Sequence, residues 1–369
     1  MKHIALLCGS SNTVINFRLT LIRFLKKKDY KVSVVCLDDT RREEILKEEV
    51  SFYTVGVPNR TTNIFKRFFL SNRYKKLLCK LKPDLCFSFM LTPNTSGIIG
   101  AKKAKIQNLF SMVEGLGDAF SNNSLKWRLI RRLECFLYRK AFKNVRKVFF
   151  LNNDDKGELI KRKIIKQSQA IVVSGIGVDL DYFKELPIIN HRSFLMIARL
   201  VETKGIFDYC NASRIVKKKY PNSHFVLLGE EFTLTAKDIQ EYIDDGCIEY
   251  RGFVFDVRPY ISQCGVFVLP SFYREGFPAS IMEAMASGRC VITTDNVGCR
   301  EAVVDGYTGF IVRPKDSSDL AKKCLFLCEN PEIVDKMGTN AREFAERFFD
   351  EKNINAMILS ILEQTYDYS

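Results

Sequence analysis

The chain has 369 residues, 46% of them hydrophobic and 27% charged, so it can bury ordinary hydrophobic cores, and its length favours two domains. No apolar run approaches the roughly 18 residues that span a bilayer, and the N-terminal run IALLC is too short for the core of a signal peptide. We therefore expect a soluble cytoplasmic protein. With only three histidines, a zinc site or a Ser-His-Asp triad lacks material.

The charge is divided unevenly between the two halves. Residues 1–174 contain 35 lysines and arginines against 14 aspartates and glutamates, a net charge of +21, whereas the remainder contains 22 against 29, a net charge of −7. A strongly basic body can attract an anionic membrane surface or a nucleic acid. No RNA- or DNA-binding motif accompanies the charge, so we expect no nucleic-acid partner.

Strands and helices are expected to alternate along the whole chain. The first run of strands is HIALL, YKVSVVCL, SFYTVGV, LCFSF, QNLFSMV and KVFFLN, and the second is RSFLMIARL, SHFVLLGE, CIEYRGF, GVFVLPS, RCVITTD and TGFIV, before three closing helices. Such alternation predicts parallel sheets with helices on both faces. The fold class is thus α/β, with two doubly wound, Rossmann-like domains facing across a cleft at the carboxyl ends of their strands.

The division between the domains is expected near residue 175. We assign 1–174 to a first domain and 175–369 to a second. A polar, proline-containing linker is expected at 184–192, and the last helix can cross back to the first domain.

Two segments of the basic half, 63–82 and 125–147, alternate cations with large apolar groups. In the second, a helix would gather apolar residues on one broad side and cations around it; the apolar residues are Trp127, Ile130, Leu133, Phe136, Leu137 and Phe142, and the cations include Arg128, Arg131 and Arg132. This pattern is typical of a helix in a membrane interface. The alternative is a core helix with a solvated basic back.

Cations follow the first strand of the second half. Strand FLMIA ends at Arg199, and Lys204 and Gly205 stand at the start of the next helix. Two cations at a strand-to-helix turn suit a diphosphate, since arginine supplies a forked set of donors and helix starts attract anions. Alone, each could be an ordinary surface cation.

The stretch SFYREGFPASIMEAMASG holds two carboxylates, Glu275 and Glu283, with seven residues between them. Pro278 has the φ of a first helical residue, and the amides of Gly276, Phe277 and Ala279 form an anion site at the helix start. Two carboxylates that accept from vicinal hydroxyls, flanking a diphosphate site, suit a nucleotide sugar. The alternatives are a solvated polar stripe for Glu283 and a plain loop carboxylate for Glu275.

These motifs carry a family resemblance. REGFPASIMEAMASG, GCREAVVDGYTGFIV and ARLVETKG resemble the retaining glycosyltransferases of family 4, which have the GT-B fold, and the resemblance covers almost the whole chain. It implies that Glu275 contacts the transferred sugar and Glu283 the ribose. It also implies that Arg199 and Lys204 contact the diphosphate, with backbone contacts to the phosphates from Gly276, Phe277, Pro278 and Ala279.

The N-terminal half adds acceptor candidates. CGSSNTVINFR, with Gly9 and Arg18, resembles the family's glycine-containing turn near the acceptor and the leaving phosphate, and VEGLGDAF resembles a subset that builds polysaccharides or lipid-linked glycans. Many members carry a histidine near the transferred sugar. This chain offers no obvious one, and Glu114 is a candidate for that neighbourhood.

The resemblance implies a bacterial hexosyltransferase that acts with retention. It would move a hexose or N-acetylhexosamine, with N-acetylgalactosamine favoured, from a UDP-sugar to a polyprenyl-diphosphate-linked saccharide at the inner face of the cell membrane. No cofactor is expected, and no metal, because Arg199 and Lys204 supply positive charge that can stabilise the leaving diphosphate. The alternatives are a sugar-nucleotide epimerase on the same fold, a glycosidase, or a non-enzymatic protein that binds anionic surfaces.

Overall fold

The computed structural model describes residues 2–56, 64–122 and 124–366; the side chains of 64–68 and of Asp118 also lie outside the description. The basic segment predicted at 63–82 is therefore described only in part. The chain divides into two compact units, one of residues 1–173 and 352–369 and the other of residues 174–351.

Unit 1 contains a seven-stranded sheet in the order β3-β2-β1-β4-β5-β6-β7. All of its pairings are parallel. The strands are β1 His3–Leu7, β2 Lys31–Cys36, β3 Ser51–Thr54, β4 Leu85–Phe89, β5 Asn108–Val113, β6 Lys147–Phe150 and β7 Ala170–Val172. After β1 the chain adds β2 and β3 on one side of β1, and it then places β4 on the other side. The topological switch point therefore lies between β1 and β4.

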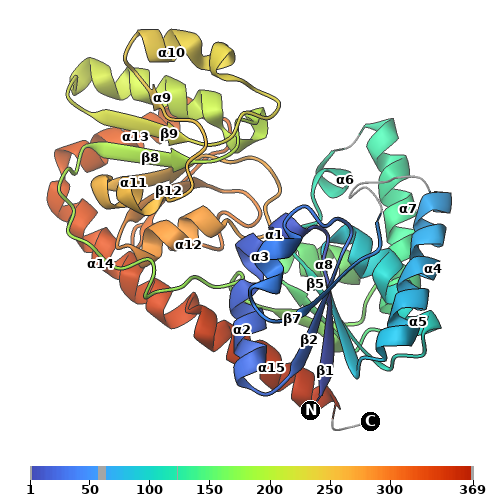
Figure 1. Cartoon of the computed structure of the whole chain (residues 1–369). Coiled ribbons are helices and arrows are strands. Elements are labelled where there is room, and N and C mark those ends of the chain that lie inside the picture. Colours follow the sequence, from blue (N-terminus) through green and yellow to red (C-terminus); the bar gives the residue numbers. More distant parts are fainter. Residues whose placement is uncertain (1, 57–63, 123, 367–369) are drawn as a thin grey trace. The chain divides into compact units, whose positions relative to one another are not determined.

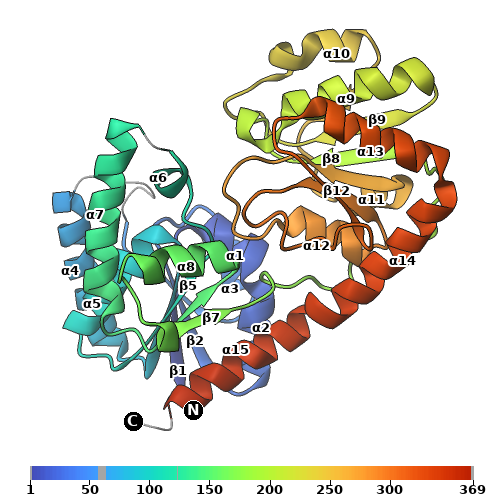
Figure 2. The ribbon, with the colours of Figure 1, turned by 180° about the vertical axis from the view of Figure 1, so that it is seen from behind.

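Helices cover both faces of this sheet. They are α1 Ser11–Phe17, α2 Leu19–Lys27, α3 Arg42–Leu46, α4 Ile64–Leu81, the π-helical turn η1 Pro93–Gly97, α5 Ile98–Lys103, α6 Asp118–Ser121, α7 Leu125–Phe142, α8 Asn153–Lys161, the short turn η2 Gln167–Gln169 and α15 Glu351–Tyr366. Figures 1 and 2 show α4, α5 and α7 grouped on one face and α2 with α15 on the other. The return of α15 is fixed by hydrogen bonds from Tyr30 Oη to Glu363 at 2.6 Å and from Arg146 to the Thr365 carbonyl at 3.0 Å.

Unit 2 contains a six-stranded parallel sheet in the order β10-β9-β8-β11-β12-β13. Its strands are β8 Ser193–Ile197, β9 His224–Leu228, β10 Glu249–Tyr250, β11 Val266–Leu269, β12 Cys290–Thr294 and β13 Gly309–Val312. Its helices are η3 Glu202–Lys204, α9 Ile206–Lys219, η4 Ala236–Ile239, α10 Gln240–Asp244, α11 Arg258–Gln263, α12 Ala279–Ala286, α13 Ser317–Glu329 and α14 Pro331–Phe348. The switch point of this sheet lies between β8 and β11.

The prediction of two doubly wound parallel sheets is confirmed, whereas the prediction of a linker at 184–192 was wrong. That segment is part of unit 2: the Leu186 carbonyl accepts a 2.7 Å hydrogen bond from the fully buried Arg289, and His191 Nε2 lies 2.8 Å from Asp335 Oδ1. A polar, proline-containing composition indicates irregular backbone, but irregular backbone can still be held to a domain by such contacts.

The apolar residues predicted to share one side of α7 differ in burial. Leu137 and Phe142 are buried in the core of unit 1, and Trp127 and Ile130 pack against it, because α7 lies on η1 and α5. Phe136, by contrast, is 54% exposed. The exposed apolar residues of the helix are Leu125, Leu129 and Phe136, and the exposed cations between them include Arg128 and Arg132, with Arg131 half-buried.

Candidate active site

The functional residues predicted in the second half gather at the switch point of unit 2. The loops that follow the neighbouring strands β8 and β11 are joined, since the amides of Phe272 and Tyr273 each donate a 2.9 Å hydrogen bond to the Thr203 carbonyl. Gly205 makes this approach possible: its φ is +79°, and a Cβ would lie 2.1 Å from the Pro270 oxygen. Only glycine suits that position, and it sets Lys204 beside the loop that leaves β11.

Lys204 and Glu275 form an ion pair at this junction. The same carboxylate oxygen, Oε1, accepts a 2.9 Å hydrogen bond from the buried hydroxyl of Ser271. Gly298 packs behind this loop with φ +83°, where a Cβ would lie 2.6 Å from the Glu275 carbonyl oxygen. The structure thus brings together the carboxylate and the ammonium that the sequence pattern placed 71 residues apart.

Glu283 lies on α12, which follows this loop. Pro278 has φ −69° and an extended ψ of 115° and caps the helix, which begins at Ala279. Ile281, Met282 and Ala284 are buried around it, and burial raises the pKa of the Glu283 carboxyl to about 7. Within residues 2–56, 64–122 and 124–366, no side chain pairs with that carboxyl.

Gly276 and Phe277 connect Glu275 to this helix. The ring of Phe277 meets the ring of Phe349 edge to face, with centroids 5.4 Å apart, which anchors the segment to the core of unit 2. The segment before α12 therefore has a fixed position relative to the Lys204–Glu275 pair.

Arg199 lies just beyond β8 and is exposed. Its guanidinium stands over the ring of Phe232 at 5.0 Å from the centroid. Among the residues that the structure describes, no carboxylate pairs with Arg199. Sequence reasoning missed Phe232, although its place directly after strand FVLLG was a usable signal.

The candidates of unit 1 also meet at a switch point. Gly9 follows β1, and Arg18 separates α1 from α2. Arg18 is only 5% exposed, forms an ion pair with Glu114 and lies over the Phe89 ring at 4.2 Å. Burial lowers the pKa of the Arg18 guanidinium to about 10.

Glu114 begins a loop that is held by a residue of α8. The amide of Leu116 donates a 3.2 Å hydrogen bond to the buried carboxylate of Asp155, and Asn152 donates to the same oxygen at 3.2 Å. Gly115 and Gly117 give the loop its positive φ values, 136° and 63°. Asp155 was not predicted, although the polar run NNDD directly after strand KVFFL was a signal for it.

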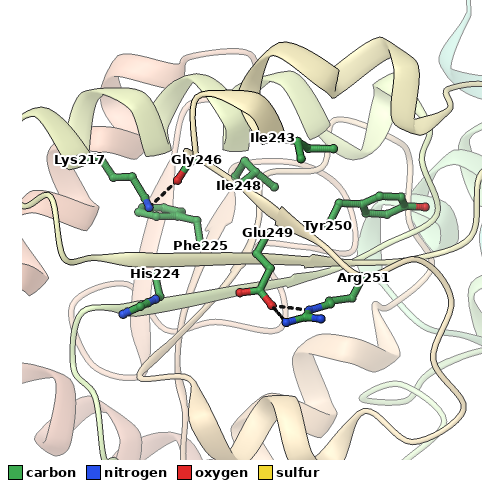
Figure 3. Close-up of a pocket in the computed structure, with 9 residues that line it drawn as sticks. All are labelled: Lys217, His224, Phe225, Ile243, Gly246, Ile248, Glu249, Tyr250 and Arg251. Atoms are coloured by element: carbon green, nitrogen blue, oxygen red, sulfur yellow. Dashed lines mark hydrogen bonds and ion pairs between the residues drawn. The ribbon is translucent and has the colours of Figure 1, made fainter.

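A concavity in unit 2 lies apart from these residues. It has a volume of about 480 Å³ and is lined by Lys217, His224, Phe225, Ile243, Gly246, Ile248, Glu249, Tyr250 and Arg251. His224 opens β9, and Gly246 and Ile248 precede β10, so much of the lining comes from the amino ends of the strands (Figure 3). The predicted residues are at the opposite, carboxyl ends.

Two further properties bear on function. In the described part of the chain, no helix is both long enough and apolar enough to cross a bilayer. No group of three or more metal-binding side chains occurs in the same residues.

The charged groups gathered at the unit 2 switch point include Lys204, Glu275, Arg199 and Glu283, a set that can bind a diphosphate and sugar hydroxyls.

Each half of the chain matches a glycosyltransferase model. Residues 3–152 match the model "Glycosyl transferase 4-like", and residues 180–344 match "Glycosyl transferases group 1". One curated relative is the N,N'-diacetylbacillosaminyl-diphospho-undecaprenol alpha-1,3-N-acetylgalactosaminyltransferase of Campylobacter jejuni, 28% identical over 98% of both chains.

Solved structures agree on the fold. A glycosyltransferase from Rickettsia africae superposes with a TM-score of 0.79 at 18% identity over all of both chains. HepE from Anabaena, solved in complex with UDP, superposes with a TM-score of 0.79 at 19% identity over 99% of this chain and 100% of its own. Because both matched family models are glycosyltransferase models and the Campylobacter jejuni relative is named as an N-acetylgalactosaminyltransferase, the epimerase alternative is wrong. The chain belongs to the glycosyltransferases, with a 4-like domain followed by a group 1 domain on the GT-B fold.

Proposed function

We propose that this protein is a retaining hexosyltransferase that moves a sugar from a UDP-sugar to a polyprenyl-diphosphate-linked saccharide. The observation that carries the proposal is the Lys204–Glu275 ion pair beside the open guanidinium of Arg199, at a switch point where α/β sheets bind ligands. N-acetylgalactosamine is the favoured sugar, because the Campylobacter jejuni relative that aligns along nearly the whole chain is named for its transfer to a diphospho-undecaprenol saccharide.

The donor would bind across the carboxyl ends of β8 and β11. Arg199 and Lys204 would hold the diphosphate, with the amides of Gly276, Phe277 and Ala279 as further donors. Glu275 would accept from hydroxyls of the transferred sugar. Glu283, half-buried on α12, would accept from the ribose hydroxyls, and the lack of a side-chain partner for its carboxyl among the described residues supports that role.

Chemistry would proceed on one face of the sugar. The bond from the anomeric carbon to the β-phosphate oxygen breaks, and a bond from the acceptor hydroxyl oxygen forms on the same face. The hydroxyl proton passes to the departing phosphate oxygen, and UDP leaves. Arg199 and Lys204 would stabilise the negative charge that develops on the diphosphate. Because two side-chain cations serve this purpose, we propose that no metal or other cofactor is needed.

The acceptor would bind to unit 1, with Gly9, Arg18 and Glu114 as candidate residues. Arg18 is buried and paired with Glu114, which supports a role in holding that carboxylate rather than in touching the acceptor itself. Glu114 retains 21% side-chain exposure, enough to reach an acceptor hydroxyl.

We also propose that unit 1 docks on the anionic inner face of the cell membrane through α4, α5 and α7. On α7, Leu125 and Leu129 are 73% and 57% exposed beside exposed Arg128 and Arg132. Lys103 of α5 has its pKa lowered by burial and by the nearby ammonium groups of Lys140 and Lys75, which come from α7 and α4. Such a surface of apolar groups and crowded cations suits anionic lipid.

A transfer assay with candidate donors tests the reaction. UDP-GalNAc, UDP-GlcNAc, UDP-glucose, UDP-galactose and GDP-mannose are incubated with the purified protein and a polyprenyl-diphosphate saccharide, with and without EDTA. We expect transfer from one UDP-sugar, undiminished by EDTA. Lys204→Ala should remain folded and lose transfer, whereas Lys336→Ala, at an exposed lysine of α14, should retain it. Transfer by the Lys204 variant at the wild-type rate would contradict the site assignment.

Vesicle flotation tests the membrane face. Replacing Arg128, Arg131 and Arg132 by Glu should release the protein from vesicles that contain anionic lipid, while nucleotide binding is unchanged. The matched control replaces three exposed lysines of unit 2 by Glu: Lys218, Lys219 and Lys322. Equal release by both triple variants would mean that overall charge, not this face, governs binding.

A further inference from the structure

Phe232 is an exposed aromatic ring with a specific neighbour. The ring is 60% exposed, and the guanidinium of Arg199 stands over it at 5.0 Å from the centroid. A single exposed apolar residue needs no explanation. A ring held beneath a cation of this switch point that pairs with no carboxylate among the described residues does need one.

The loop that carries Phe232 is fixed to the segment that carries Arg199. The Leu200 amide donates to the Glu230 carbonyl at 2.8 Å, and the amides of Thr233 and Leu234 donate back to the Leu200 carbonyl at 3.2 and 3.0 Å. These three bonds bracket Phe232 on both sides. Hydrogen bonds between backbone atoms therefore hold the segment that carries the ring against the segment that carries the guanidinium.

The C-terminal part of the same loop is also held by hydrogen bonds. The Phe232 amide donates to the Leu234 carbonyl at 3.1 Å. Glu231 accepts from the Ala236 amide at 2.9 Å, which keeps the nearest acidic side chain engaged with its own backbone. The loop thus presents a ring to Arg199 and directs a carboxylate elsewhere.

The kind of contact matters for what Arg199 can still do. A guanidinium stacked on a ring uses the face of its plane, whereas its N–H donors lie in the plane and point outward. A carboxylate partner would instead occupy those donors. An arginine held by a ring is therefore oriented and at the same time open to the oxygens of a diphosphate.

We propose that Phe232 is a positioning residue for diphosphate binding, acting through Arg199. The inference rests on the proposed function and adds to it a residue that touches neither sugar nor phosphate. Without the ring, Arg199 would sample other rotamers, and part of the binding free energy would be lost in ordering it.

The test measures binding of UDP and of uridine to the full chain by titration and competition. Phe232→Leu should raise the Kd for UDP roughly two- to fivefold, the range expected for an exposed cation–π contact, and leave uridine binding unchanged. Phe232→Tyr, which keeps the ring, should bind UDP as the wild type does. In an Arg199→Ala background, Phe232→Leu should have no further effect, because the two act as one unit.

Phe348→Leu is the matched control, since Phe348 is an exposed ring that lies 5.0 Å from the guanidinium of Arg347 on α14. Three results would overturn the inference: unchanged UDP binding by Phe232→Leu, an equal loss of uridine binding, or a persisting effect in the Arg199→Ala background. If the wild type itself bound no UDP, the proposed function would fail and this inference with it, an outcome distinct from the other three.

Discussion

The switch points of the two units contain the same contact in two settings. In unit 1 the guanidinium of Arg18 lies 4.2 Å from the centroid of the buried Phe89 ring, is almost wholly buried and pairs with Glu114. In unit 2 the guanidinium of Arg199 lies 5.0 Å from the exposed Phe232 ring and has no carboxylate partner among the described residues.

The glutamates at the two switch points show the same difference as the arginines. Glu114 is paired, whereas Glu283 is half-buried and pairs with no described side chain. A charged group whose partners lie within the protein mainly supports the structure, since breaking the pair leaves a buried charge. A charged group that is oriented but unpaired is available to a ligand. We therefore expect a change of Arg18 to appear mainly as lost stability and a change of Arg199 mainly as lost activity.

Arg199→Ala should have the largest effect. We expect kcat/KM to fall roughly 100- to 1000-fold, the loss typical for a donor aimed at charge that develops in the transition state. The melting temperature should stay within a degree or two of wild type, because the side chain is exposed and pairs with no carboxylate among the described residues. Steady-state transfer kinetics and a thermal melt together measure this.

Arg347→Ala serves as the control for Arg199, since it removes an exposed arginine with the same 5.0 Å distance to a ring. A large drop in melting temperature for Arg199→Ala, or wild-type activity, would contradict the expectation that Arg199 differs from Arg18 in serving activity rather than stability.

Arg18→Ala should instead destabilise unit 1. The change removes a buried cation and leaves Glu114 without its partner, and we expect a loss of roughly 2–3 kcal/mol in the free energy of unfolding. Arg23→Ala breaks a more exposed pair with Glu48 in the same unit and should lose less than about 1 kcal/mol. Urea unfolding followed by circular dichroism compares them; equal losses would show that Arg18 behaves as an ordinary surface cation.

The sequence predicted the regular parts of this molecule well, because local patterns determine them. Strands such as HIALL and FVLLG are continuous apolar runs, which buried parallel strands require, and the glutamates of REGFPASIME stand in a recognisable motif. The pair between Lys204 and Glu275 could be expected from their common sheet edge.

What the sequence could not supply were the partners that depend on loop geometry. Phe232 and Asp155 act through loops whose shapes follow from backbone hydrogen bonds between distant segments. The apolar side of α7 was misjudged for a related reason: periodicity shows that a helix has an apolar side, but the packing of α5 and η1 decides which part of that side is covered.

Glu283→Gln should have a smaller effect, and it should raise the stability of the protein while it weakens UDP binding. The folded pKa of Glu283 is raised by burial to about 7 from its ordinary value of 4.5. Below pH 4.5 the carboxyl is protonated in both the folded and unfolded states, so it contributes no difference. As pH rises from about 4.5 to about 7, the carboxyl ionises in the unfolded state before it ionises in the folded state, and the folded state loses stability over that range. The variant, which stays neutral, should be more stable than wild type by roughly 1–2 kcal/mol at pH 8.

The same variant should bind UDP more weakly, since an amide is a poorer acceptor for two ribose hydroxyls than a carboxylate. Glu343→Gln, at an exposed position of α14, should change neither property. Unfolding curves at pH 4.5 and pH 8 separate the explanations: a stability gain at pH 8 that disappears at pH 4.5, together with weaker UDP binding, marks a carboxylate kept unpaired for a ligand. A loss of stability at pH 8 would mean that Glu283 has a partner within the fold, as Glu114 does, and that the two switch points are alike in this respect.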